Sequence, residues 1–249
     1  MTETTRDLFF GGRMLIEQPK SRDSYRVNID SLLLAGFAAA GKHAQRAFDL
    51  GAGVGAVGLS LMQLNAASHI TFIDVSQEAT SLASRNAEHN GWADRSRVLT
   101  GDVQELALEH KGEADLIVTN PPFSQPRTSV IPRSERLTQA RIGDLSAFLA
   151  AARQLGGKGS RSCYVYPAQY LSVLLGYARE QGLEPKRVRF VHSRAHTYAR
   201  LALVECKAGK PGGLVVEPPL VEWNGETRSE EVRLLIEEAR LVRRADDRA

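Results

Sequence analysis

The chain has 249 residues, of which 43% are hydrophobic and 24% charged, values typical of a soluble globular protein with one sizeable α/β domain. Its 32 lysines and arginines against 29 acidic residues leave a net charge of +3, too small by itself to indicate a nucleic-acid partner. Two cysteines, and no apolar run near the ~20 residues of a membrane span, exclude a disulfide framework and a membrane helix, and we expect a cytoplasmic protein.

The N-terminal segment predicts a hairpin followed by a helix. Residues 8–18 form two short apolar runs around a Gly-Gly pair, which is typical of two strands joined by a turn. Asp30 precedes the apolar run 31–40 and is predicted to be the N-cap of a helix. We expect residues 1–40 to pack on a core formed by 41–249, so that the chain makes one compact domain.

From residue 41 onward, strand and helix patterns alternate. Seven strands are expected, at 47–50, 69–73, 97–99, 115–119, 162–166, 187–191 and 200–205. Helices are expected at 56–65, 77–90, 144–155 and 168–180, and from about 229 onward. This alternation predicts an α/β, Rossmann-like fold with a mostly parallel seven-stranded sheet and helices on both faces. Because no helix separates the last two strands, they should close the sheet as an antiparallel hairpin.

A glycine-rich turn joins the first core strand to its helix. Gly51, Gly53 and Gly55 allow the main chain to approach a ligand closely and leave the N–H groups of the helix start free to meet it. Asp74, at the end of the second core strand, can hold a ribose. These features alone leave NAD and S-adenosylmethionine (SAM) equally open as the ligand.

Three further side chains favour SAM. Asp49 stands at the end of the first core strand, where a carboxylate suits an ammonium group and would repel a pyrophosphate. Asp102, after the third strand, can accept a hydrogen bond from an adenine amine. Asn120 ends the fourth strand, at the carboxyl edge where open α/β sheets bind ligands. This pattern resembles the class I SAM-dependent methyltransferases, which implies SAM as cofactor and S-adenosylhomocysteine as product.

The four residues Asn120-Pro121-Pro122-Phe123 indicate the atom that is methylated. An amine conjugated to an aromatic ring is a poor nucleophile because its lone pair is delocalised. The Asn120 side-chain carbonyl and the Pro121 main-chain carbonyl can accept hydrogen bonds from its two N–H groups and aim the lone pair at a methyl donor. Phe123 offers a face on which a base can stack. The motif therefore predicts methylation of a planar nitrogen.

The motif leaves the substrate open. It resembles that of adenine amino-methyltransferases, of guanine N2 methyltransferases acting on ribosomal RNA, and of glutamine methyltransferases acting on release factors. Small-molecule O-methylation is a further alternative, although it usually requires a metal or a general base, and the sequence indicates neither. A SAM-binding RNA scaffold without turnover is the alternative outside the enzymes.

The flanks of the motif resemble the bacterial tRNA adenine-37 N6-methyltransferase family. The similar stretches are Phe10-Gly11-Gly12-Arg13, Gln18-Pro19, residues 25–35, residues 132–141 and Pro218-Pro219. The resemblance implies an adenine N6 in RNA as acceptor, with tRNA as the favoured RNA. In that family the entry segment closes over SAM, which implies that Asp30 approaches the cofactor; a plain helix cap is the alternative.

Two basic segments favour an RNA partner. Between residues 124 and 143 four arginines accompany one acidic residue, and residues 186–200 carry five lysines and arginines with no acid. We expect both segments near the carboxyl edge, where they could contact phosphates. The candidate RNA-binding residues are Arg127, Arg133, Arg136, Arg141 and Arg194. His192, His196 and Tyr198 are either RNA contacts or ordinary residues of a turn.

Overall fold

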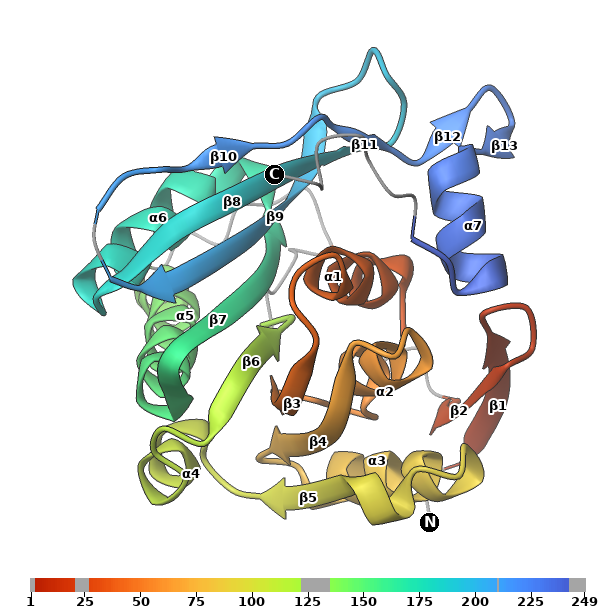
Figure 1. The fold of residues 1–249 in the computed structure, drawn as a ribbon, viewed down its shortest axis with the longest axis horizontal. Helices are drawn as coiled ribbons and strands as arrows, with labels where there is room; N and C mark the ends of the chain where they lie inside the picture. Colours follow the sequence, from red (N-terminus) through yellow and green to blue (C-terminus); the bar gives the residue numbers. More distant parts are fainter. Residues whose placement is uncertain (1–2, 21–26, 122–134, 210, 242–249) are drawn as a thin grey trace.

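The computed structural model describes residues 3–20, 27–121, 135–209 and 211–241, and gives the main chain alone for 135–144. The core strands are β3 (Ala44–Leu50), β4 (Ala67–Asp74), β5 (Ser96–Thr100), β6 (Ala114–Thr119), β7 (Gly156–Pro167), β8 (Leu183–His192) and β9 (Ala199–Ala208). Their order in the sheet is β8-β9-β7-β6-β3-β4-β5 (Figure 1). All neighbours from β5 to β7 are parallel, and β9 runs antiparallel to both β7 and β8. The Rossmann-like sheet with its antiparallel closing hairpin is therefore confirmed.

The expected strand number was too low. In the described part of the chain the sheet has nine strands, because β10 (Val215–Val216) and β11 (Leu220–Val221) pair in parallel with β8. Each contributes only two residues, too few to give a recognisable alternation in the sequence. A further small hairpin of β12 (Trp223–Asn224) and β13 (Thr227–Arg228) precedes α7 (Glu230–Glu238).

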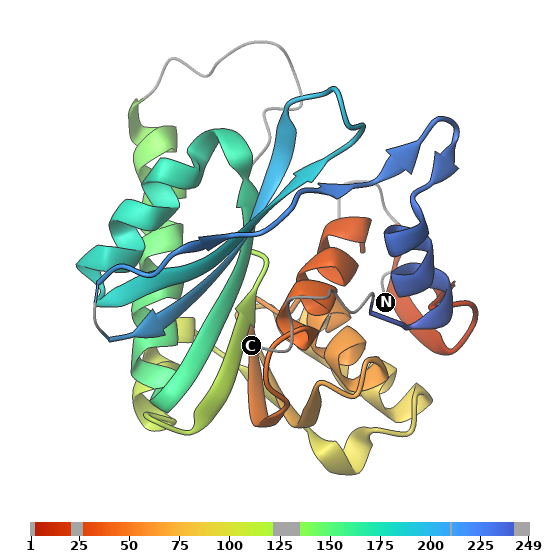
Figure 2. The ribbon, with the colours of Figure 1, turned by 45° about the horizontal axis from the view of Figure 1, so that its top comes forward.

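Helices cover both faces of the sheet (Figures 1 and 2). One face packs against α1 (Ile29–Ala39), α2 (Ala56–Gln63) and α3 (Gln77–His89), and the other against α4 (Val103–Glu109), α5 (Glu135–Leu155) and α6 (Leu171–Glu180). Successive strand residues pack into the hydrophobic cores on opposite faces of the sheet. Phe72 packs on the side of α1–α3 and Ile73 on the side of α4–α6, and both are fully buried. This is the pattern expected for a parallel sheet covered on both sides.

Two helix starts differ from those predicted. The N-cap of α1 is Asn28, whose Oδ1 accepts from Asp30 N, and Asp30 lies inside the first turn. Helix α5 begins at Glu135 and not at the expected residue 144, so Asp144 is an interior residue of the helix. Helix α4, which follows Asp102, was not anticipated. The described helices include none long and apolar enough to cross a membrane, and both cysteines are buried free thiols.

The N-terminal hairpin consists of β1 (Thr4–Phe9) and β2 (Met14–Pro19), a sheet separate from the central one. It is attached by Asn86 of α3 and by Asn90, the C-cap of that helix. Asn86 Oδ1 accepts from Glu17 N at 2.7 Å while its Nδ2 donates to Glu17 O at 2.9 Å. Asn90 makes the equivalent pair of bonds with the main chain of Leu15. The two side chains thus replace the neighbouring strand that β2 lacks on this side.

Candidate functional site

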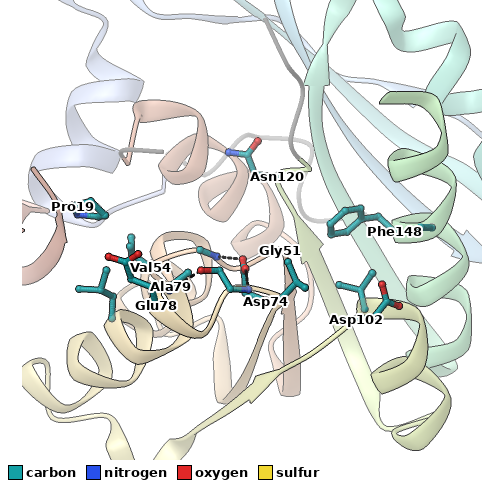
Figure 3. Close-up of a pocket in the computed structure, with 15 residues that line it drawn as sticks. Pro19, Gly51, Val54, Asp74, Glu78, Ala79, Asp102, Asn120 and Phe148 are labelled. Atoms are coloured by element: carbon teal, nitrogen blue, oxygen red, sulfur yellow. Dashed lines mark hydrogen bonds between the residues drawn. The ribbon is translucent and has the colours of Figure 1, made fainter. Parts of the chain in front are cut away.

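The predicted site residues come together because four parallel strands end at one edge of the sheet. The glycine turn follows β3, Asp74 ends β4, Asp102 follows β5 and Asn120 follows β6. These strands are adjacent in the order β6-β3-β4-β5. Their carboxyl ends therefore form a continuous rim, and Figure 3 shows the side chains arranged along it.

The glycine turn requires glycine for two reasons. Gly51 and Gly53 have φ angles of 65° and 55°, which side chains disfavour. A Cβ on Gly51 would also lie 3.0 Å from the ring of Phe148 in α5. The turn is fixed from the opposite side by Gly53 N, which donates to Asp74 Oδ2 at 2.8 Å. These contacts hold the main chain of the turn in place, and the turn forms a wall of the cavity described next.

A cavity of about 580 Å³ opens in front of this wall. That volume lies in the range of sites for small ligands and cofactors. Its described lining residues are Pro19, Gly51, Gly53, Val54, Asp74, Val75, Ser76, Glu78, Ala79, Leu82, Asp102, Val103, Asn120, Ala147 and Phe148. Five of the predicted cofactor residues, Gly51, Gly53, Asp74, Asp102 and Asn120, are therefore among those that line one cavity.

Two of the three carboxylates at the cavity, those of Asp74 and Asp102, are oriented by the main chain. Asp74 Oδ1 accepts from Ser76 N at 2.9 Å, in addition to the bond from Gly53 to Oδ2. Asp102 is the N-cap of α4, and its Oδ1 accepts from Gln104 N at 2.8 Å. A carboxylate has about four lone-pair sites, so both groups keep acceptor capacity for a ligand.

Asn120 is positioned from two directions. Thr119 Oγ1 donates to Leu50 O at 2.9 Å and ties the end of β6 to the end of β3. Asn120 Nδ2 donates to Ser31 Oγ in the first turn of α1, at 3.4 Å. Pro121, the next residue, is buried. Pro122 and Phe123, the rest of the predicted catalytic motif, lie outside the described residues.

Asp49 lies behind the glycine turn and is not among the residues that line the cavity. It is 1% exposed, and its Oδ2 accepts from Gly58 N, within α2, at 2.8 Å. Burial raises the pKa of this carboxyl to about 7, against the lowering effect of the Gly58 hydrogen bond. Its contact is therefore with the protein main chain, in contrast to the direct ligand contact that we predicted. Gly55, just before α2, likewise stays off the cavity.

Asp30 is also directed into the protein. It is 7% exposed, and its Oδ1 pairs with Arg200 Nη2 at 2.8 Å. Arg200 in turn donates to both carboxylate oxygens of Glu222. These bonds outweigh the effect of burial and raise the pKa of the Arg200 guanidinium. Asp30 thus anchors the start of α1 and is not among the cavity residues.

The basic segment 186–200 is less available than its composition suggests. Arg187 pairs with Glu205 and Glu217, and Arg189 with Glu231. Carboxylates distant in the sequence therefore neutralise Arg187 and Arg189, and for these two the pairing does not support the expected contact with phosphates. Arg194 is exposed, in the connection between β8 and β9. The remaining arginines predicted to bind RNA, Arg127, Arg133, Arg136 and Arg141, fall outside the residues whose side chains are described.

Sequence reasoning missed the residues that complete the cavity. Phe148 and Ala147 come from α5, and Pro19 comes from the end of β2. Val75, Glu78 and their neighbours follow from Asp74 along the chain and could have been inferred from its position. Phe148 carried no such signal, because its place opposite Gly51 depends on how α5 packs.

Comparisons with known proteins agree with this geometry. The methyltransferase small domain model matches residues 26–142. The tRNA1(Val) (adenine(37)-N6)-methyltransferase of Serratia proteamaculans is 31% identical over 180 residues, 71% of this chain and 68% of that protein. A crystal structure of a predicted O-methyltransferase from Agrobacterium tumefaciens aligns with a TM-score of 0.68 at 22% identity, over 83% of this chain and 94% of that one. M. jannaschii TYW2 in complex with AdoMet aligns at 0.53 and 12% identity, over 83% and 85% of the two chains.

Proposed function

The chain belongs to the family that contains the tRNA1(Val) (adenine(37)-N6)-methyltransferases, and on this basis we propose that it methylates the exocyclic N6 of an adenine in RNA, with tRNA as the substrate. It is a SAM-dependent methyltransferase with the class I fold. The observation that carries the proposal is Asn120, at the end of β6, on the same cavity as the glycine turn and two carboxylates.

The residues around the cavity fit SAM. Asp74, at the end of β4, can accept from ribose hydroxyls, and Asp102, at the start of α4, can accept from the adenine amine. The main chain at Gly51 and Gly53 gives a polar ligand close access. When bound, SAM supplies an electrophilic methyl group on its sulfonium. Asp49 supports this site indirectly, since it holds α2 beneath the turn.

The chain's own contribution to the reaction is the orientation of the substrate amine. Asn120 Oδ1 and the Pro121 main-chain oxygen accept from its two N–H groups, which favours a pyramidal nitrogen with its lone pair directed into the cavity. No protein base is needed, because the methylated ammonium product is acidic enough to lose its proton to water. Phe123 would hold the flat face of the base.

The choice of an RNA adenine rests on the relatives and on the chemistry of the motif. The Serratia relative is named as a tRNA adenine N6-methyltransferase, and the Asn-Pro-Pro-Phe sequence suits any planar amine or amide. A guanine N2 in ribosomal RNA and a protein glutamine remain outcomes that the experiment distinguishes. Within the sequence itself, the four arginines of residues 124–143 favour RNA, because they can contact phosphates.

The test is methyl transfer from labelled SAM to unmodified tRNA transcripts, to total RNA and to a protein extract. We expect label in N6-methyladenosine, identified by mass spectrometry of the nucleosides. Asn120→Ala should lower kcat by roughly 100-fold or more, since an oriented polar contact made in the transition state is lost. Gln45→Ala, an exposed amide side chain at the amino end of β3, is the control and should keep wild-type kcat. Label in guanine, in protein or in a small molecule alone would overturn the proposal.

A further inference from the structure

The connection between β8 and β9, residues 193–198, is a rigid projection. It extends beyond the carboxyl edge of the sheet (Figure 2). His192 Nδ1 bonds with Thr197 O at 2.8 Å, and Thr197 N donates to Arg194 O at 3.0 Å. The Thr197 hydroxyl accepts from Arg194 N at 3.1 Å. These bonds across the turn fix its shape without help from any ligand.

A second segment braces the projection from outside. Glu222 N donates to His192 O at 2.8 Å, and Trp223 N donates to Ser193 O at 3.0 Å. The Arg194 guanidinium donates to Gly225 O, in the turn between β12 and β13. The two hairpins therefore stand side by side as one unit, as Figure 2 also shows.

This unit presents an aromatic ring and polar side chains to solvent. Tyr198 is 99% exposed, and Arg194 and His196 are exposed beside it in the sequence. The tyrosine packs against almost nothing in the protein, although the main chain that carries it is held firmly. Because the main chain is already fixed, stacking of this ring on a flat partner orders only its two side-chain torsions, and bases offer such a face.

The strand register gives the distance from this ring to Asn120. Thr119 pairs with Tyr164, which pairs with Val204 on β9. Tyr198 precedes Val204 by about six residues in the direction of the carboxyl edge. At ~3.3 Å per residue and ~4.8 Å per strand, Tyr198 lies on the order of 20 Å from Asn120. That span equals roughly six nucleotides stacked at 3.4 Å, so the ring reaches beyond the reacting nucleotide.

We propose that residues 193–198 form a second RNA contact, in which Tyr198 stacks on a base several nucleotides from the methylated adenine while Arg194 and His196 face the neighbouring phosphates. This inference rests on the proposed function, because it takes the substrate to be RNA. It assigns the hairpin to substrate affinity and not to the chemical step.

The test compares Tyr198→Ala and Tyr198→Phe with the wild type. Because the side chain is 99% exposed, neither change should alter the melting temperature. Tyr198→Ala should weaken binding of a labelled tRNA transcript about tenfold and raise its KM by the same factor at unchanged kcat, while Tyr198→Phe should retain wild-type affinity. Leu108→Ala, a 63% exposed residue in the second half of α4, is the control for loss of exposed apolar surface.

Equilibrium binding separates the two proposals. If the wild type binds tRNA but methylates another substrate, a weaker Tyr198→Ala complex still supports the contact surface while the proposed reaction fails. If the wild type methylates tRNA and Tyr198→Ala binds it equally well, the contact surface is wrong and the proposed reaction stands. The contact surface would also be refuted if Tyr198→Ala lowered kcat at unchanged RNA affinity, or if the wild type did not bind RNA.

A separate observation concerns Ser31, and it too rests on the proposed reaction. Ser31 is 1% exposed, and its Oγ accepts from Asn120 Nδ2. The helix turn that carries it is fixed by the Asn28 cap and by the Asp30–Arg200 ion pair. In this arrangement Ser31 Oγ holds the Nδ2 end of the amide, at 3.4 Å, so Oδ1 is the opposite end of the group. We infer that Ser31 is a positioning residue for the Asn120 carbonyl.

Ser31→Ala should lower kcat about tenfold while leaving unchanged the KM for RNA and the rise in melting temperature on adding SAM. Ser60→Ala is the matched control, a fully buried helix serine whose hydroxyl donates to Ala56 O within α2. It should leave kcat unchanged. An unaltered kcat in Ser31→Ala, or a loss confined to SAM binding, would refute the positioning role.

Discussion

Asp49 shows how a single carboxylate can support a ligand site without facing it. The side chain is enclosed under the glycine turn, and its hydrogen bond to Gly58 N joins the end of β3 to α2. Its acidic character and its position at the strand end were evident in the sequence. The direction in which its side chain points was not evident, because the carboxylate oxygen could accept either from the Gly58 N–H group or from a ligand.

Asp49→Asn should change how stability depends on pH. The folded pKa of about 7 lies above the ordinary 3.8, so between pH 4 and 7 the folded state holds a proton that the unfolded state releases. The free energy of unfolding therefore falls as pH rises through this window, and the loss is complete above pH 7. Asparagine keeps a carbonyl for Gly58 N and cannot ionise, so the variant should gain stability relative to wild type, by up to about 4 kcal/mol near pH 8.

Urea unfolding at pH 5 and pH 8 measures this difference. Asp115→Asn serves as control, since exposed Asp115 also accepts main-chain N–H groups, from Gln45 and Arg46. Parallel pH profiles for wild type and Asp49→Asn would contradict the raised pKa.

At the scale of elements, strongly patterned segments were predictable and boundary signals were misleading. The strands β3, β4 and β6 follow from apolar runs, and their parallel order brings Asp74 and Asn120 together. The start of α5 was missed because the expected helix began at Asp144, although residues 135–142 contain good helix formers. Asn28 and Asp30 are both plausible caps, and only packing of α1 decides between them.

Asn86→Ala should both destabilise the protein and weaken SAM binding. Asn86 is fully buried, and besides its two bonds to Glu17 it donates to Val54 O at 3.0 Å, in the glycine turn. Its removal leaves three buried main-chain groups without partners, at a cost of about 2–4 kcal/mol. Asn90→Ala also detaches β2 but does not touch the turn, so it should lower stability without the same loss of SAM affinity.

Thermal melts and titration calorimetry with SAM separate the two effects. Equal SAM affinities in the two variants would show that Val54 is held by other contacts.

For the whole molecule, the distribution of charge could not be read from local composition. Residues 186–200 look like a free basic surface in the sequence. In the structure, three of their arginines, Arg187, Arg189 and Arg200, form ion pairs with glutamates that come later in the chain: Glu205, Glu217, Glu222 and Glu231. The overall layers, by contrast, follow from the alternation of strands and helices. The cavity depends on both: its rim was foreseeable, while the wall from α5 required the folded arrangement.

SAM should raise the melting temperature, because it binds the folded state alone. At a concentration 100 times its Kd the gain is about 2.7 kcal/mol. For a chain of this length that corresponds to a shift of roughly 5–10 °C. NAD at the same multiple of the SAM Kd should give no shift, and differential scanning fluorimetry provides the comparison. A shift with NAD and none with SAM would contradict the assignment of the glycine turn to SAM.

The two short strands β10 and β11 have a consequence for how the molecule behaves among its copies. They lie along the outer side of β8, a ten-residue strand that would otherwise present an open row of N–H and C=O groups. Such a row is a template for pairing with strands of other chains. The segment after Ala208 therefore protects the sheet against edge-to-edge aggregation, and a chain shortened there is expected to associate through β8 at concentrations at which the full chain stays dispersed.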